Sequence, residues 1–212
     1  MITNELNDAG IPPVVMTFAA TDPTSGAGLQ ADLLTLTALG CHGLSVVTGI
    51  TVQDTTGVEN FQPVDADCVS DQARHVLEDI PIHAFKIGLI GDVENISVIA
   101  DIISDYPEVP VILDPVLASG RGDELSTDDT IEALRELLIP QTTIIVPNSL
   151  EARRLFTDNP DDCLSLASCA TQLIELGAEW VLIKGAHENT VAVINSLYNQ
   201  DGLVRQDTWE RL

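Results

Sequence analysis

The chain has 212 residues, 45% of them hydrophobic, which suits one globular domain with a substantial core and excludes an intrinsically disordered chain. Its net charge is −24, which argues against nucleic acid or an anionic membrane as a partner. An anionic substrate would have to be held by backbone N–H groups, by a metal ion, or by the few basic side chains.

The N-terminus and the cysteines indicate where such a protein works. Residues 1–12 are polar and acidic, which predicts a flexible tail, not a signal peptide, before a domain over 13–212. No apolar run reaches membrane-spanning length. The four cysteines, at positions 41, 68, 163 and 169, have neither CxxC spacing nor a companion His cluster. We therefore expect a reduced, cytoplasmic protein without a zinc site or a disulfide framework.

The hydrophobic pattern predicts strands that alternate with helices. The predicted strands are 14–20, 43–52, 58–64, 84–91, 109–116, 142–146 and 180–185, followed by a hairpin of 191–198 and 203–209. The predicted helices are 29–39, 66–80, 93–104, 128–138, a short helix that carries Glu151, and 163–176. This alternation predicts an α/β fold, with a mostly parallel central sheet and helices on both faces.

A glycine-rich turn joins the first strand to the first helix. It contains Asp22, Gly26 and Gly28, and we expect both glycines to allow positive φ and the close approach of a ligand. The N-terminus of the following helix offers unpaired N–H groups to an anion. The alternative is an ordinary turn that happens to be rich in glycine. A formal G-x-G-x-x-A match also suggests a dinucleotide-dependent oxidoreductase, but its first glycine comes several residues after the strand.

Polar or glycine residues follow the ends of most predicted strands. Because the carboxyl ends of parallel strands share one edge of a sheet, we expect these residues to border one crevice. The set is Asp22, Gln53, Gly88, Asp114, Asn148, Lys184 and Gly185.

The oxygen-bearing side chains of Asp114, Asn148 and Glu151 are candidates for binding Mg²⁺ or its waters. Magnesium uses one or two carboxylates together with phosphates and water. The structural alternative is that Asn148 caps a helix whose first turn contains Glu151.

In these motifs the chain resembles the hydroxymethylpyrimidine/phosphomethylpyrimidine kinases of thiamine biosynthesis, within the ribokinase-like superfamily. The resemblance covers nearly the whole chain. Its segments are 20–32 (ATDPTSGAGLQAD), 51–55 (TVQDT), 86–89 (KIGL), 113–116 (LDPV), 119–123 (SGRGD), 147–152 (PNSLEA) and 184–187 (KGAH).

The resemblance implies an enzyme that uses ATP and Mg²⁺ to phosphorylate an aminopyrimidine alcohol and then its monophosphate. It implies a substrate site of Asp22, Gly26, Gln53, Gly88 and Leu89, a nucleotide site of Asn148, Lys184 and Gly185, and metal binding by Asp114 and Glu151. Two positions depart from the family, since Gln53 replaces a frequent Glu and Leu89 a frequent Met. The expected partners are the small pyrimidine and ATP, with a homodimer possible.

The family's Gly-[Ser/Thr]-Gly-Cys segment, which supplies the anion hole and the catalytic Cys, is expected beyond Leu212. None of the four cysteines here lies in that motif, so we assign no catalytic residue, and we expect residues 1–212 to bind the pyrimidine without phosphorylating it. Two alternatives stay open: a pyridoxal/pyridoxine kinase, and a non-catalytic pyrimidine-binding protein.

Overall fold

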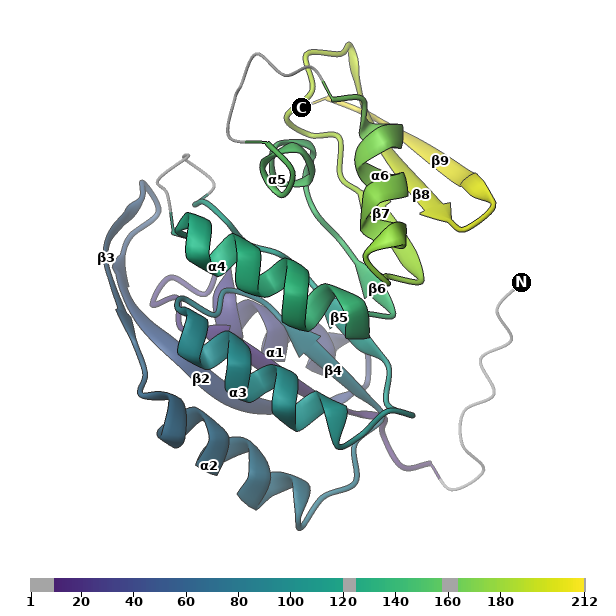
Figure 1. Cartoon of the computed structure of the whole chain (residues 1–212). Helices are drawn as coiled ribbons and strands as arrows, with labels where there is room; N and C mark the ends of the chain where they lie inside the picture. Colours follow the sequence, from purple (N-terminus) through teal and green to yellow (C-terminus); the bar gives the residue numbers. More distant parts are fainter. Residues whose placement is uncertain (1–9, 120–124, 158–163, 212) are drawn as a thin grey trace.

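A single nine-stranded sheet organises the protein (Figure 1). The computed structural model describes residues 10–119, 125–157 and 164–211. Six neighbouring strands are parallel, and the pairings β2–β3, β7–β8 and β8–β9 at the two edges are antiparallel, in the order β3-β2-β1-β4-β5-β6-β7-β8-β9. The strands are β1 (Val14–Ala20), β2 (His42–Gln53), β3 (Val58–Pro63), β4 (Ala84–Ile87), β5 (Val111–Leu113), β6 (Ile144–Ile145), β7 (Trp180–Ile183), β8 (Ala192–Asn199) and β9 (Gly202–Glu210).

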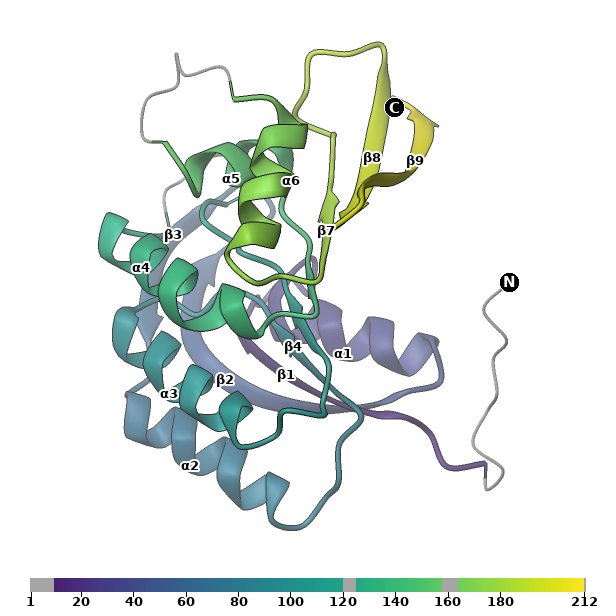
Figure 2. The ribbon, with the colours of Figure 1, turned by 45° about the vertical axis from the view of Figure 1, so that its right-hand side comes forward.

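Helices cover both faces of this sheet, as the sequence predicts. Figure 2 shows α1 on the opposite side of the sheet from α2, α3 and α4. The helices are α1 (Gly28–Ala38), α2 (Ala66–Leu77), α3 (Val93–Ser104), α4 (Asp128–Ala133), α5 (Ser149–Arg154) and α6 (Leu166–Glu175). A π-helical turn (Leu134–Leu138) and a 3₁₀ turn (Ile139–Gln141) continue α4.

The core lies between the sheet and the helices of the α3 side. Phe18 of β1 and Phe85 of β4 are fully buried, and their ring centroids are 6.1 Å apart. The predicted inner face of α3 is confirmed, because Ile96, Ile99 and their periodic partners are buried. This contact packs β1 against β4, which are neighbours in the parallel region.

The first helix is less amphipathic than its leucine spacing predicts. Leu29 is buried, whereas Leu39 caps the C-terminus of α1 and is 73% exposed. Leu33 and Leu36 lie over Gly43, where a side chain would collide with them. Glycine in β2 therefore lets α1 pack close to the sheet.

Several element ends differ from the predictions. The strand expected over 109–116 is only Val111–Leu113, because Pro110 and Pro115 flank it and proline offers no N–H for pairing. The helix expected from Cys163 begins at Leu166 with Ser165 as its N-cap, and Cys163 lies outside the described residues. Most of the expected tail, residues 1–9, also lies outside them. No helix among the described residues is long and apolar enough to cross a membrane.

Candidate functional site

The predicted site residues lie along one edge of the sheet. The parallel strands end there in the spatial order β2, β1, β4, β5, β6 and β7. At or just after these ends are, in the same order, Gln53, Asp22, Gly88, Asp114, Asn148 and Lys184. At a strand spacing of about 4.8 Å, the edge from Gln53 to Lys184 spans roughly 24 Å. An edge of this length has room for two small ligands side by side.

The buried side chain of Asp22 accepts hydrogen bonds from other residues of the glycine-rich turn. It is 2% exposed, and its carboxylate accepts hydrogen bonds from the Thr24 N–H (2.8 Å), the Thr24 hydroxyl (3.0 Å) and the Ala27 N–H (2.8 Å). Burial alone would raise the pKa of Asp22, but these hydrogen bonds, with a contribution from Gly26, lower it. The carboxylate is therefore anionic and shapes the turn, a role that the sequence interpretation did not include.

The backbone of the turn corrects one prediction. Gly28 has φ +60°, as expected, and a Cβ there would lie 2.5 Å from the Ala20 carbonyl oxygen. Gly26 does not have positive φ; Ser25 takes the left-handed conformation, with φ 61°. The expectation for Gly26 was wrong because the turn reverses one residue earlier. Gly28 is the position where close approach of the backbone excludes a side chain.

Gly88 and Leu89 continue β4 at the middle of the edge. The Gly88 N–H donates to the Phe18 carbonyl (2.8 Å), and the Leu89 carbonyl accepts from the Ala20 N–H (3.0 Å). The Thr48 hydroxyl donates to the same Leu89 carbonyl (2.6 Å). These hydrogen bonds connect the ends of β1, β2 and β4 to one another.

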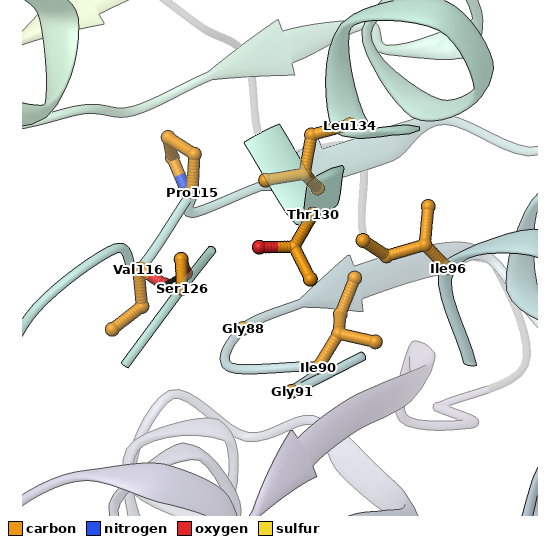
Figure 3. A pocket seen from close by; sticks show the side chains of 9 residues that line it. All are labelled: Gly88, Ile90, Gly91, Ile96, Pro115, Val116, Ser126, Thr130 and Leu134. Atoms are coloured by element: carbon orange, nitrogen blue, oxygen red, sulfur yellow. Dashed lines mark hydrogen bonds between the residues drawn. The ribbon is translucent and has the colours of Figure 1, made fainter. Parts of the chain in front are cut away.

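A small cavity lies beside Gly88 on the α3 and α4 side of the sheet (Figure 3). Its volume of about 10 Å³ has room for roughly one water molecule. Ile96, Thr130 and Leu134 line its wall, and Figure 3 shows them around the opening beyond Gly88. This cavity cannot hold an aromatic ring, so it is not the pyrimidine pocket that the sequence interpretation expects around Gly88.

Gln53 lines a larger hollow at the turn between β2 and β3. This hollow has a volume of about 300 Å³, and Asp54, Thr56 and Glu59 also line it. That volume is at the lower end of the range for small-molecule sites. The half-buried Gln53 side chain therefore borders space that a ligand could enter.

At the other end of the site, Lys184 pairs with Asp114. The Lys184 ammonium lies 2.9 Å from Asp114 Oδ1, although β6 separates their strands. Their side chains are 39% and 27% exposed, so both remain accessible. The pair supplies one cation and one anion at the edge of a very acidic protein.

Asn148 and Glu151 form a capping box at the start of α5. Asn148 Oδ1 accepts from the N–H groups of Leu150 and Glu151, both at 2.9 Å, and Glu151 Oε2 accepts from the Asn148 N–H at 2.7 Å. This is the structural alternative that the sequence left open. Binding of nucleotide by Asn148 stays a prediction, as do the ligand contacts of Gly26 and Gly185.

The pKa of Glu151 is raised by its environment. Burial raises the pKa of its carboxyl, and the nearby charge of Asp114 raises it further, against opposing contributions from the Asn148 N–H and Lys184. A cation between the two carboxylates would relieve this repulsion, and their hard oxygens suit Mg²⁺. The described residues contain no group of three His, Cys, Asp or Glu side chains that could hold a metal. A site of two carboxylates completed by phosphates and water fits this arrangement.

Sequence reasoning missed two ion pairs near this edge. Arg153 makes two hydrogen bonds to Glu188 (2.7 and 3.0 Å), which lower the pKa of Glu188 and tie α5 to the loop after β7. Lys86 of β4 pairs with Asp32 of α1 at 2.8 Å. A lysine within the apolar strand predicted over 84–91 was the available signal for the second pair. Arg121 lies outside the described residues, and His187 is exposed in the loop after β7.

The cysteines of the described residues are free, as expected. They are Cys41, Cys68 and Cys169, and none lies at the sheet edge that carries the site. Burial raises the pKa of Cys169 in α6, so that thiol stays protonated. The location of a catalytic segment beyond Leu212 stays a prediction.

Comparison with known proteins identifies relatives that are kinases. A hydroxymethylpyrimidine/phosphomethylpyrimidine kinase from Streptomyces coelicolor is 37% identical over 176 residues, which is 83% of this chain and 65% of the relative. One from Mycobacterium leprae is 37% identical over 177 residues, 83% of this chain and 63% of that protein. This chain thus spans slightly less than two thirds of the length of these relatives.

Solved structures give the same fold. A phosphomethylpyrimidine kinase from Clostridium difficile 630 superposes with a TM-score of 0.80 at 32% identity, over 93% of this chain and 84% of the other. A pyridoxal kinase from Staphylococcus aureus in complex with ADP superposes with a TM-score of 0.82 at 26% identity, over 95% and 73%. The model of the family described as "Phosphomethylpyrimidine kinase" matches residues 22–212 of this chain. The chain therefore belongs to the phosphomethylpyrimidine kinase family, with the ribokinase-like fold.

Proposed function

We propose that this protein binds an aminopyrimidine alcohol and ATP side by side, for phosphorylation of the alcohol and then of its monophosphate. The observation that carries the proposal is the division of the sheet edge into two chemically different halves. The ends of β1, β2 and β4 present a glycine-rich turn and an amide, whereas the ends of β5, β6 and β7 present carboxylates and a lysine. A neutral ring suits the first half, which we call the acceptor half. Polyphosphate with a cation suits the second, which we call the nucleotide half.

In the acceptor half, Gln53 is the residue best suited to read the pyrimidine edge. Its amide offers both a donor and an acceptor, which an aminopyrimidine edge can pair with. The carboxylate of Asp22 already accepts three hydrogen bonds from its own turn, so its main contribution is to hold that turn in shape. Gly88, at the end of β4, borders the same half of the sheet edge.

In the nucleotide half, Lys184 would contact the phosphates, and Asp114 and Glu151 would hold Mg²⁺. The metal, when bound, would neutralise charge on the phosphates. Lys184 now neutralises Asp114, so nucleotide binding would exchange this pair for contacts with phosphate and metal. The capping box keeps Glu151 beside Asp114 by fixing the first turn of α5.

A pyridoxal kinase activity is the second candidate. The S. aureus pyridoxal kinase structures support it, because one was solved with pyridoxal and superposes with a TM-score of 0.81. The substituted pyridine of pyridoxal could occupy the same acceptor half. The identity of 37% to the pyrimidine kinases, against 26% for the pyridoxal kinase, favours the pyrimidine.

Calorimetry on the 212-residue chain would test the proposal. The titrants are the aminopyrimidine alcohol, its monophosphate and pyridoxal, each with and without a non-hydrolysable ATP analogue and Mg²⁺. We expect the pyrimidine to bind more tightly than pyridoxal, and we expect the ATP analogue not to displace it. Tighter binding of pyridoxal would favour the second candidate, and competition between pyrimidine and nucleotide would contradict two separate halves.

A further inference from the structure

A network of three polar side chains lies between α1 and the sheet. Asp32 Oδ2 accepts a hydrogen bond from the Thr17 hydroxyl and another from the Lys86 ammonium, both at 2.8 Å. Thr17 of β1 and Lys86 of β4 are direct neighbours in the parallel register. Thr17 is fully buried, and the Lys86 and Asp32 side chains are 23% and 19% exposed. The network therefore joins one helix to two neighbouring parallel strands, β1 and β4.

Such a network is a costly way to stabilise a fold. Removing charges from water offsets much of their attraction, so a largely buried ion pair is weak evidence for stability. The chain has only two lysines, and one of them is placed here inside a strand. A role in fixing one arrangement of α1 on the sheet explains the network better than a role in overall stability.

On the helix side, the network lies close to the glycine-rich turn. Asp32 comes two residues after Gln30, whose side-chain oxygen accepts the Asp22 N–H at 2.7 Å. A shift of α1 along the sheet would move Gln30 and would disturb the Asp22 turn. The start of α1 therefore connects the ion pair at Asp32 to the turn.

On the strand side, the network lies against Gly88. A Cβ built on Gly88 would lie 2.8 Å from the Lys86 ammonium, so the ammonium occupies the space beside this glycine. Lys86 thus lies beside Gly88 in the proposed acceptor half, while its ammonium pairs with Asp32 of α1. The same ion pair connects both sides of that half, the Asp22 turn and Gly88.

We propose that Lys86 and Asp32 are positioning residues, whose ion pair holds the glycine-rich turn and Gly88 in the one arrangement that fits the acceptor. The proposal rests on the proposed function for the identity of that acceptor, the aminopyrimidine. In the part of the chain that the structure describes, the hydrogen bonds of the network join α1, β1 and β4 and do not reach the residues at the ends of β5, β6 and β7. Loss of the pair should therefore weaken acceptor binding selectively.

The test is a double-mutant cycle of Lys86→Met, Asp32→Asn and the combined variant. Each single change should weaken pyrimidine binding about 10-fold, within the range for residues of one network, and should change the affinity for the ATP analogue less than about 2-fold. The combined variant should bind pyrimidine no more weakly than either single variant. Arg74→Met is the matched control, because the Arg74–Asp105 pair is exposed (45% and 55%) and joins α2 to the end of α3.

A second measurement needs no ligand. In Lys86→Met, amide hydrogen exchange by NMR should accelerate at Thr24 and Ala27, whose N–H groups bond to Asp22, while the buried amides of α3 keep their protection. Asp32→Asn gives the same readout if Lys86→Met does not fold, because it removes the charge that holds Lys86 while its amide oxygen can still accept the Thr17 hydrogen bond. Unchanged exchange in the turn, or equal losses of pyrimidine and nucleotide affinity, would overturn the positioning role. If exchange in the turn is faster in Lys86→Met but the wild type binds no pyrimidine, the proposed function is overturned, while the role of the ion pair in positioning the turn is supported.

Discussion

Replacement of Gly28 by alanine tests how tightly the glycine-rich turn is packed. Gly28 has φ +60°, and its added Cβ would lie 2.5 Å from the Ala20 carbonyl oxygen. The left-handed conformation alone costs an L-residue about 1–2 kcal/mol. The collision with backbone, which cannot rotate away, adds about 1–3 kcal/mol, as overpacking of a closed site does. We expect Gly28→Ala to lower the free energy of unfolding by about 2–5 kcal/mol, a large part of a typical total of about 5–15 kcal/mol.

Gly40→Ala is the matched control at the other end of the same helix. Gly40 has φ +78°, and nothing lies within 4 Å of its added Cβ. Gly40→Ala has the same left-handed conformation as Gly28→Ala and the same effect on the unfolded chain, but no collision. We therefore expect it to lower the free energy of unfolding by only about 1 kcal/mol. Urea unfolding followed by circular dichroism measures both variants. Equal losses for Gly28→Ala and Gly40→Ala would show that the turn yields to a side chain, and the argument from close approach would fail.

Three further variants test the two halves of the site. Gln53→Ala should weaken pyrimidine binding by about 1–3 kcal/mol in calorimetry and leave nucleotide binding unchanged; an unchanged pyrimidine affinity removes Gln53 from the site. Lys184→Met should reduce ATP affinity more than pyrimidine affinity, with the exposed Arg205→Met as control, and normal ATP binding would make Lys184 a surface charge. Because the pKa of Glu151 is raised in the folded state, its protonation favours folding at acidic pH, and this contribution is lost as pH rises through the folded pKa. Glu151→Gln should therefore match wild type near pH 4 and exceed its stability at pH 7–8 in urea unfolding, and a variant that falls behind as pH rises would contradict the raised pKa.

The local features of this fold follow from the sequence because they depend on neighbours in the chain. Hydrophobic periodicity located the inner face of α3, and the cap of α5 by Asn148 was one of the two alternatives that the sequence left open. The left-handed Gly28 was predicted from the same local chemistry. One local detail differs, since Ser25 and not Gly26 has the positive φ angle in this turn.

The position of the polar residues at strand ends was also predictable, because parallel strands share an edge. Their order along that edge was not. Strand order depends on contacts between residues far apart in the chain, which no local pattern encodes. Only the sheet order shows that Gly88 lies between the ends of β1 and β5, and that Asp114 and Lys184 meet across β6.

The chemistry of individual side chains depended most on the tertiary structure. The sequence alone placed Asp22 in the glycine-rich turn, Lys86 within a strand and Glu151 in a short helix. Burial and partners then decided that Asp22 holds its own turn, that Lys86 joins α1 to β4, and that Glu151 has a raised pKa. Desolvation and charge pairing act through space over a few ångströms, whereas the partners are up to 54 positions apart in the chain, as Lys86 and Asp32 are. The sequence therefore specified which groups were available, and the packing of the sheet specified what each one does.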